Sequence, residues 1–120
     1  MSDNISVVTS NYVPGYKISE IKGLIWGLTI RSRGLGGNIV AGLRAIGGGE
    51  IKEYVTLLNK ARDDALDRLK AEASKLGANA VIDVRFDSSD IAQSMTEIVA
   101  YGTAVIIEKE SGKIQPVSLR

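Results

Sequence analysis

The chain has 120 residues and a formal net charge of +1, with 15 Lys and Arg residues against 14 Asp and Glu residues. This length predicts one domain with a single core. The balanced charge lacks the basic surface of nucleic-acid-binding proteins, so no nucleic-acid partner is expected. Because the chain contains neither Cys nor His, disulfides, thiolate or imidazole metal sites, and Cys or His nucleophiles are excluded.

The sequence has no feature typical of export or membrane insertion. Residues 1–4 lack the basic and then apolar pattern of a signal peptide. The longest apolar stretch, residues 23–30, is too short to span a bilayer. We therefore expect a cytoplasmic protein with no membrane partner.

Two strands are predicted in the first third of the chain. Ile5–Thr9 is a short β-prone run, and the turn signal Pro14-Gly15 separates it from a longer strand, Tyr16–Ile30. Gly23 and Gly27 interrupt the longer strand, which indicates a bulge, a bend or the close approach of another backbone. Apolar residues occupy both of its faces, with one set at Leu24, Trp26, Leu28 and Ile30 and the other at Ile21 and Ile25.

A basic, glycine-rich segment follows this strand and precedes a predicted short helix. Its candidate anion-binding residues are Arg31, Arg33, Gly36, Gly37 and Asn38. The segment contains neither a G-x-G-x-x-G nor a G-x-x-x-x-G-K-[ST] motif. A turn at a subunit boundary is the simpler interpretation.

The centre of the chain has the pattern of a long helix followed by a strand. Gly77 is predicted to end the helix in the left-handed conformation. Residues 78–86 then alternate as in a strand, with Ala80, Ile82, Val84 and Phe86 predicted on one apolar face. From Lys52 to Leu76, apolar residues recur at steps of three or four: Tyr54, Leu58, Ala61, Ala65, Leu69, Ala73 and Leu76.

Three carboxylates, Asp83, Asp87 and Asp90, lie near the end of the predicted strand. Oxygen ligands of this kind suit a hard cation, so they form a candidate metal site. Their spacing matches no EF-hand loop. Residues 87–90 are predicted to form a polar, solvated loop, which is the simpler interpretation.

The last predicted strand, Thr96–Glu108, is apolar or small on both faces. One long helix can cover only one face of an antiparallel sheet, so the other face needs a partner, and we predict a cyclic homo-oligomer. One face comprises Ile98, Ala100, Gly102, Ala104 and Ile106, and the other comprises Val99, Tyr101, Thr103, Val105 and Ile107.

Four polar side chains lie beside apolar stretches: Glu50, Arg62, Glu97 and Tyr101. Arg62 borders the buried stripe of the helix, so we expect it to have a partner. A structural ion pair at an interface is favoured over a catalytic role, and no catalytic residue or cofactor is assigned. An enzyme that uses interface carboxylates is a less favoured alternative.

Four motifs stand out in chain order: Ile46-Gly47-Gly48-Gly49-Glu50, Ala61-Arg62-Asp63-Asp64-Ala65, Leu76-Gly77-Ala78-Asn79-Ala80-Val81-Ile82 and Ala100-Tyr101-Gly102-Thr103-Ala104-Val105. In order and spacing they resemble the YbjQ-like family of small prokaryotic proteins of unknown function, some of which are labelled heavy-metal-binding. The resemblance covers Ile5 to Glu108. It implies an α+β fold with a dodecin-like β-α-β-β subunit, its helix on an antiparallel sheet, assembled into a ring-shaped homopentamer. A heavy-metal label that depends on Cys or His has no ligands here.

We therefore expect one domain over residues 1–110 and an irregular, partly disordered tail over residues 111–120. The leading functional hypothesis is a non-enzymatic, ring-forming homo-oligomer that holds a small ligand between its subunits or in a central channel. The alternative is a metal- or anion-binding module whose carboxylate or glycine-rich-loop site forms at the interface. The sequence does not identify the ligand.

Overall fold

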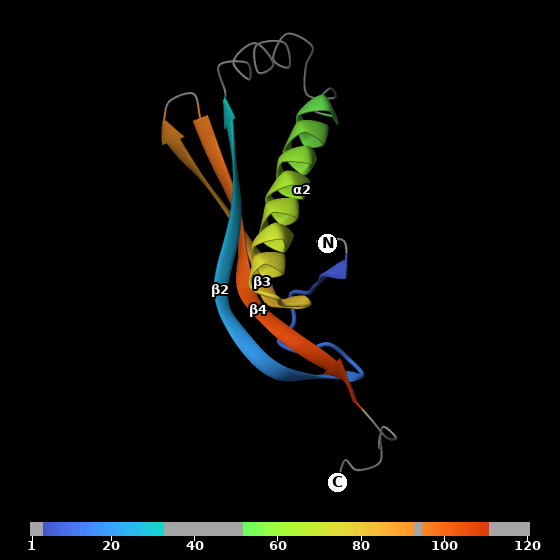
Figure 1. Ribbon diagram of the computed structural model, residues 1–120. Coiled ribbons are helices and arrows are strands. Elements are labelled where there is room, and N and C mark those ends of the chain that lie inside the picture. The colour runs from blue at the N-terminus through green and yellow to red at the C-terminus, as the bar shows by residue number, and fades with distance from the viewer. Residues whose placement is uncertain (1–3, 33–51, 93–94, 111–120) are drawn as a thin grey trace.

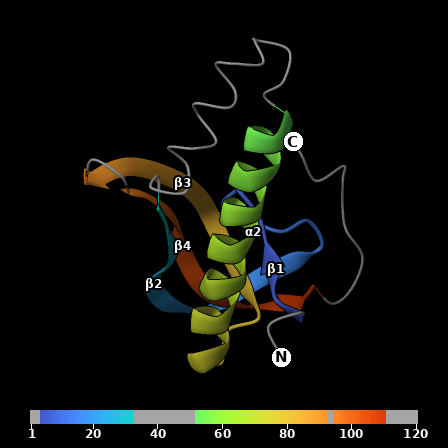
Figure 2. The ribbon, with the colours of Figure 1, turned by 90° about the horizontal axis from the view of Figure 1, so that it is seen from above.

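The computed structural model describes residues 4–32, 52–92 and 95–110. Figure 1 shows one long helix lying against one face of a long, bent sheet, and Figure 2 shows the same two layers from above. This arrangement confirms the predicted α+β architecture. The elements are, in chain order, β1 (Ser6–Val7), β2 (Tyr16–Ser32), α2 (Lys52–Lys75), β3 (Ala80–Ala92) and β4 (Met95–Lys109).

The sheet has four strands in the order β1-β3-β4-β2. β4 is antiparallel to both β2 and β3. β1 is parallel to β3, through Ser6 opposite Ala80 and Val7 opposite Val81. The prediction of a purely antiparallel sheet is therefore wrong, because the N-terminal segment runs beside the start of β3 in the same direction. β1 is also shorter than the predicted strand, Ile5–Thr9.

Small buried residues let α2 lie close to the sheet. Gly77 follows the helix with a φ of 77°, which confirms the predicted left-handed stop. Leu58 and Leu76, predicted on the buried stripe, are exposed: Leu58 lies on the flank of α2, and Leu76 lies beyond its last residue, Lys75. The completely buried positions recur at every fourth residue: Ala61, Ala65, Leu69 and Ala73.

Two glycines shape β2, as the sequence predicts. Gly23 has a φ of 128° and lies where the register against β4 shifts, which marks a bulge. At Gly27 the backbone of α2 approaches the strand directly. A Cβ atom there would lie 2.3 Å from the amide nitrogen of Leu69 and 2.6 Å from the carbonyl oxygen of Ala65.

β3 contains a bulge that changes which residues face the helix. Asp83 has a φ of 55°, and the register against β4 shifts between Ile82 and Arg85. Because of the extra residue, Val81 and Val84 both pack in the core under α2, whereas Ile82 packs on the opposite face of the sheet. The predicted common face for Ile82 and Val84 is therefore wrong.

Residues 87–90 belong to β3, so the predicted polar loop is also wrong. They pair in sequence with residues 96–99 of β4. Cross-strand pairing outweighs the low β propensity of Asp and Ser here. The predicted short helix after Asn38 and the predicted tail, residues 111–120, lie outside the described residues.

The two faces of the sheet are covered to different extents. The face under α2 holds the main core, in which Ile98, Ala100 and Ala104 of β4 are buried. On the other face, a smaller cluster is covered by Val8 and Val13 of the N-terminal segment. That smaller cluster comprises Ala80, Ile82, Val105 and Ile107.

Candidate functional site

One face of the sheet points away from α2. Where the N-terminal segment does not cover this face, it carries exposed apolar side chains. Leu24, Trp26 and Ile30 of β2 are 66%, 55% and 48% exposed, and Tyr101 of β4, opposite Trp26, is 38% exposed. They alternate with residues buried under the helix, as the period of two in a strand requires. We call this surface the open face, and it comprises Leu24, Trp26, Leu28, Ile30, Val99 and Tyr101.

The open face continues around the outer edge of β2 into a groove beside α2. This groove has a volume of about 620 Å³. Its rim carries three charged side chains of α2, of which Glu72 and Lys75 form an ion pair at 2.8 Å. We call it the edge groove, and it is lined by residues 24–28 of β2, by Arg68, Ala71, Glu72 and Lys75 of α2, and by Leu76, which follows the helix.

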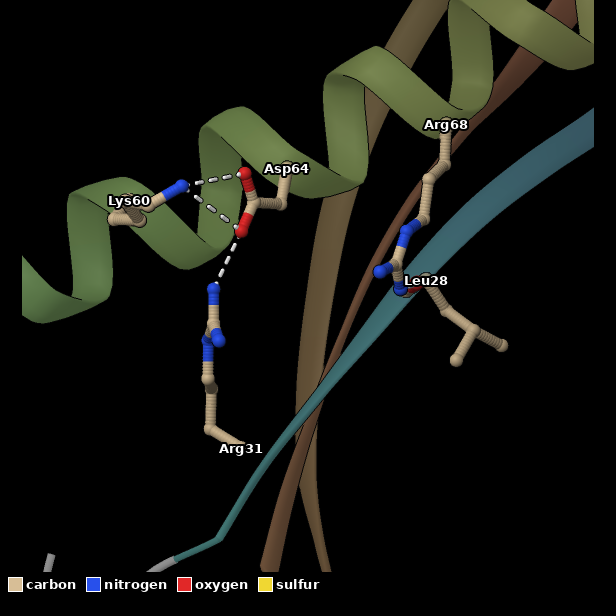
Figure 3. Close-up of polar contacts among 5 residues, drawn as sticks. All are labelled: Leu28, Arg31, Lys60, Asp64 and Arg68. Carbon is tan, nitrogen blue, oxygen red and sulfur yellow. Dashed lines mark hydrogen bonds and ion pairs between the residues drawn. The ribbon is translucent and has the colours of Figure 1, made fainter.

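Two arginines connect α2 to β2 (Figure 3), and one of them, Arg68, also lines the edge groove. The Arg68 guanidinium donates a hydrogen bond to the Leu28 carbonyl oxygen at 2.6 Å. Arg31 of β2 forms an ion pair with Asp64 of α2, and the Asp64 carboxylate also accepts a hydrogen bond from the Lys60 ammonium at 3.1 Å. The Lys60 bond, together with the Arg31 guanidinium, holds the pKa of Asp64 below its usual value.

Of the five residues predicted to bind an anion, the structure describes only Arg31. Its guanidinium points toward α2 and is bound to the Asp64 carboxylate, so its charge is balanced within the subunit (Figure 3). Arg33, Gly36, Gly37 and Asn38 lie outside the described residues, as does Glu50.

The sheet separates the other members of the predicted polar network. Arg62 lies on the helix side, with its guanidinium carbon 5.9 Å from the centroid of the Phe86 ring. Glu97 and Tyr101 lie on the opposite face, since they alternate along β4 with residues buried under α2. The Glu97 carboxylate accepts a hydrogen bond from the Ser89 hydroxyl at 3.5 Å. Arg62 therefore does not reach Glu97 or Tyr101 within one subunit.

The three candidate metal-binding aspartates are distributed along β3. Asp83 lies in the bulge. The Asp87 carboxylate accepts a hydrogen bond from the Ser88 amide at 2.9 Å, and the Asp90 carboxylate accepts one from the Thr96 hydroxyl at 3.1 Å. Within residues 4–32, 52–92 and 95–110, no group of three or more acidic side chains is placed to hold a metal ion.

Comparison with known proteins agrees with the resemblance inferred from the motifs. A family model with the description "Putative heavy-metal-binding" matches residues 5–108. The chain belongs to the YbjQ-like family. It is 64% identical to a UPF0145 protein of Thermoplasma volcanium, over 97% of this chain and 95% of that protein. It is 69% identical to a UPF0145 protein of Picrophilus torridus, over 88% of this chain and 90% of that protein.

A solved structure supports the fold of this YbjQ-like chain. The similar structure is a protein of unknown function from Pediococcus pentosaceus, assigned to the DUF74 family. The TM-score is 0.59 at 16% sequence identity, and the match covers 87% of this chain and 98% of that one. At this identity the likeness concerns the fold alone.

The donor atoms of this YbjQ-like chain do not fit the heavy metal in the family description. Soft metals are bound by thiolates and imidazoles, and the chain has no Cys or His. The described carboxylates form no cluster that would replace them. We therefore assign no metal site to the described residues.

The edge groove is a feature that sequence reasoning missed. The helical period places Arg68 on the outer face of α2, so nothing local indicates its hydrogen bond to Leu28. The available signal was indirect: Gly27 predicts close backbone approach, and a helix so close to an edge strand leaves a groove beside it.

No helix in the described part of the chain is both long and apolar enough to cross a membrane.

Proposed function

We propose that this protein acts as a ring-forming homo-oligomer whose subunits cover one another's open face. The observation that carries the proposal is the exposure of four large apolar side chains on one continuous surface: Leu24, Trp26, Ile30 and Tyr101. The single long helix lies on the other face of the sheet, and the N-terminal segment covers only part of this one. Exposed apolar patches of this kind mark surfaces that bind a partner.

A second copy of the chain is the simplest partner for this surface. Homo-oligomers of soluble proteins usually have closed symmetry. The number of subunits, five, rests on the resemblance to the YbjQ-like family. We further propose that a small apolar ligand binds where subunits meet, because Trp26 and Tyr101 present paired aromatic surfaces there. We assign no catalytic residue, and the alternative of a metal- or anion-binding module gains no support from the described side chains.

The proposal is tested by measuring the mass of the protein in solution by light scattering coupled to gel filtration. We expect a mass five times the 12.8 kDa of one chain. The double variant Trp26→Lys with Tyr101→Lys should lower the mass, because it places charges on the open face. The matched control is Val55→Lys, which adds a charge at an exposed apolar position of α2 and should leave the mass unchanged. A wild-type protein that remains a folded monomer at all concentrations would overturn the proposal.

A further inference from the structure

We propose that the edge groove of one subunit receives the outer edge of β3 from a second copy of this chain. The subunits would then join head to tail, with β2 of one beside β3 of the next. This inference rests on the proposed homo-oligomer, in which the open faces are covered, and adds which strand edges meet in it.

Among the described residues, both outer edges are unpaired in one half of the sheet. β2 is the last strand on one side. On the other side, the N-terminal segment bonds to β3 only at its start, where the Asp83 and Val84 amides donate to the carbonyl oxygens of Ser10 and Val8. In the described part of the chain, residues 86–90 of β3 therefore have β4 as their only strand neighbour. An open strand edge is a template for pairing with another strand.

The hydrogen-bonding groups of these edges point outward. Successive residues of β4 bond alternately to its two neighbours, and the Val105 carbonyl accepts from the Asn79 amide on the β3 side. Odd-numbered residues of β4 therefore bond to β3 and even-numbered residues bond to β2. Ser88, opposite Ile98, and Leu28, opposite Val99, must then direct their backbone groups away from β4.

Each outward edge is capped within its own subunit by a side chain, and the two caps have opposite charge. The Leu28 carbonyl accepts from the Arg68 guanidinium, and the Ser88 amide donates to the Asp87 carboxylate. When two such edges meet, the strands can replace these local bonds with strand-to-strand bonds. The released arginine and aspartate then lie at the same boundary.

The side chains beside the two edges are also complementary. The edge groove offers an apolar floor with Arg68, Glu72 and Lys75 on its rim. Because Glu72 and Lys75 pair with each other, Arg68 gives the rim its net positive charge. The β3 edge carries Phe86 and Ile91, which are 41% and 49% exposed. Opposite charges fix the choice and register of a partner, so this edge fits the groove better than a second copy of β2 does. The acidic residues along the β3 edge are Asp87 and Asp90.

The strand directions allow this contact to repeat. β2 and β3 are both antiparallel to β4, so they run in the same direction. Rotation about an axis along the strands preserves that direction, and β3 of the next subunit becomes a parallel neighbour of β2. A contact between two different surfaces generates a ring when the rotation closes.

Proline substitution tests the two edges separately. Ser88→Pro and Leu28→Pro each remove an outward amide that bonds to no strand of the same subunit, and proline is tolerated at strand edges. Each variant alone should have the mass of one chain, because every contact needs both edges. An equal mixture should form a heterodimer, because each variant keeps the edge that the other lacks. Ser88→Ala and Leu28→Val keep the amides and should assemble like the wild type.

Charge reversal gives a second test that does not depend on proline. Arg68→Glu or Asp87→Lys alone should weaken assembly at least tenfold, and mixing the two variants should restore a heteromeric complex. A monomeric wild type would overturn the proposed function and this inference together. An oligomeric wild type whose folded proline variants keep the full mass would overturn only this inference. A Ser88→Pro variant that assembles while Leu28→Pro does not would indicate β2 pairing with β2, and would also overturn it.

Discussion

At Gly27, the absence of a side chain sets the distance between α2 and β2. A methyl group there would meet the backbone of Leu69 and Ala65, and backbone atoms cannot rotate aside as a flexible side chain can. We predict that Gly27→Ala lowers the free energy of unfolding by about 1–3 kcal/mol through overpacking, measured by urea denaturation. Lys17→Ala, at an exposed position of the same strand, is the control and should change it by less than about 0.5 kcal/mol.

The role of Gly27 could be predicted from the sequence, whereas that of Asp83 could not. A glycine inside an apolar strand has few explanations, and close approach of another backbone is one of them. Asp83 lies in an alternating run that reads as a regular strand. Its positive φ depends on the register between β3 and β4, which is a property of paired strands and has no local signal in the sequence.

At the scale of elements, the contact between α2 and β2 combines small buried residues with polar bonds at its side. The Asp64 carboxylate joins Lys60 of the same helix to Arg31 of β2 (Figure 3). Because these bonds stabilise the charged carboxylate, they hold the pKa of Asp64 below its usual value in the folded state. Their contribution to stability is therefore present above the unfolded-state pKa and is lost as the pH falls through the folded-state pKa.

We predict that Asp64→Asn lowers the stability of the protein near neutral pH, and that the difference from the wild type begins to shrink as the pH falls below about 4. The measurement is the midpoint of urea unfolding as a function of pH. Asp67→Asn removes the same charge from an exposed position on the same helix and should show a smaller difference at neutral pH. A deficit in Asp64→Asn that persists unchanged at pH 3 would contradict the assignment, since it would not depend on the charge of Asp64.

The helix was the element that the sequence predicted best, and β3 the one it predicted worst. Apolar spacing over six turns leaves little ambiguity, and Gly77 marks the end of α2. Residues 87–90, in contrast, carry polar side chains typical of a loop. They are held in β3 by pairing with β4, so the extension depends on a partner strand that lies later in the chain.

At the scale of the whole molecule, an uncovered apolar face followed directly from strands that are apolar on both sides. The expectation needed only the count of long helices and the alternation of β2 and β4. The sequence did not indicate which part of that face the N-terminal segment covers and which part it leaves exposed. Val8 and Val13 cover the part of the face that holds Ile82 and Ile107, through contacts between segments distant in the sequence. The extent of the open face therefore had to come from the structure.

The single tryptophan of the chain reports directly on this surface. Trp26 belongs to the open face and also lines the edge groove, and more than half of it is exposed in an isolated subunit. We predict that assembly moves its fluorescence emission to shorter wavelength, because a neighbouring subunit removes the indole from water. Dilution of the protein should then shift the emission to longer wavelength over the concentration range in which sedimentation equilibrium shows the mass falling.

The Leu28→Pro variant provides the reference for this measurement, since it keeps Trp26 but blocks the β2 edge. Its emission should match that of the diluted wild type and should not change with concentration. A wild-type protein whose mass falls on dilution while its emission stays constant would place Trp26 outside the subunit boundary. In that case the open face would remain exposed to solvent in the assembly, and a different surface would have to hold the subunits together.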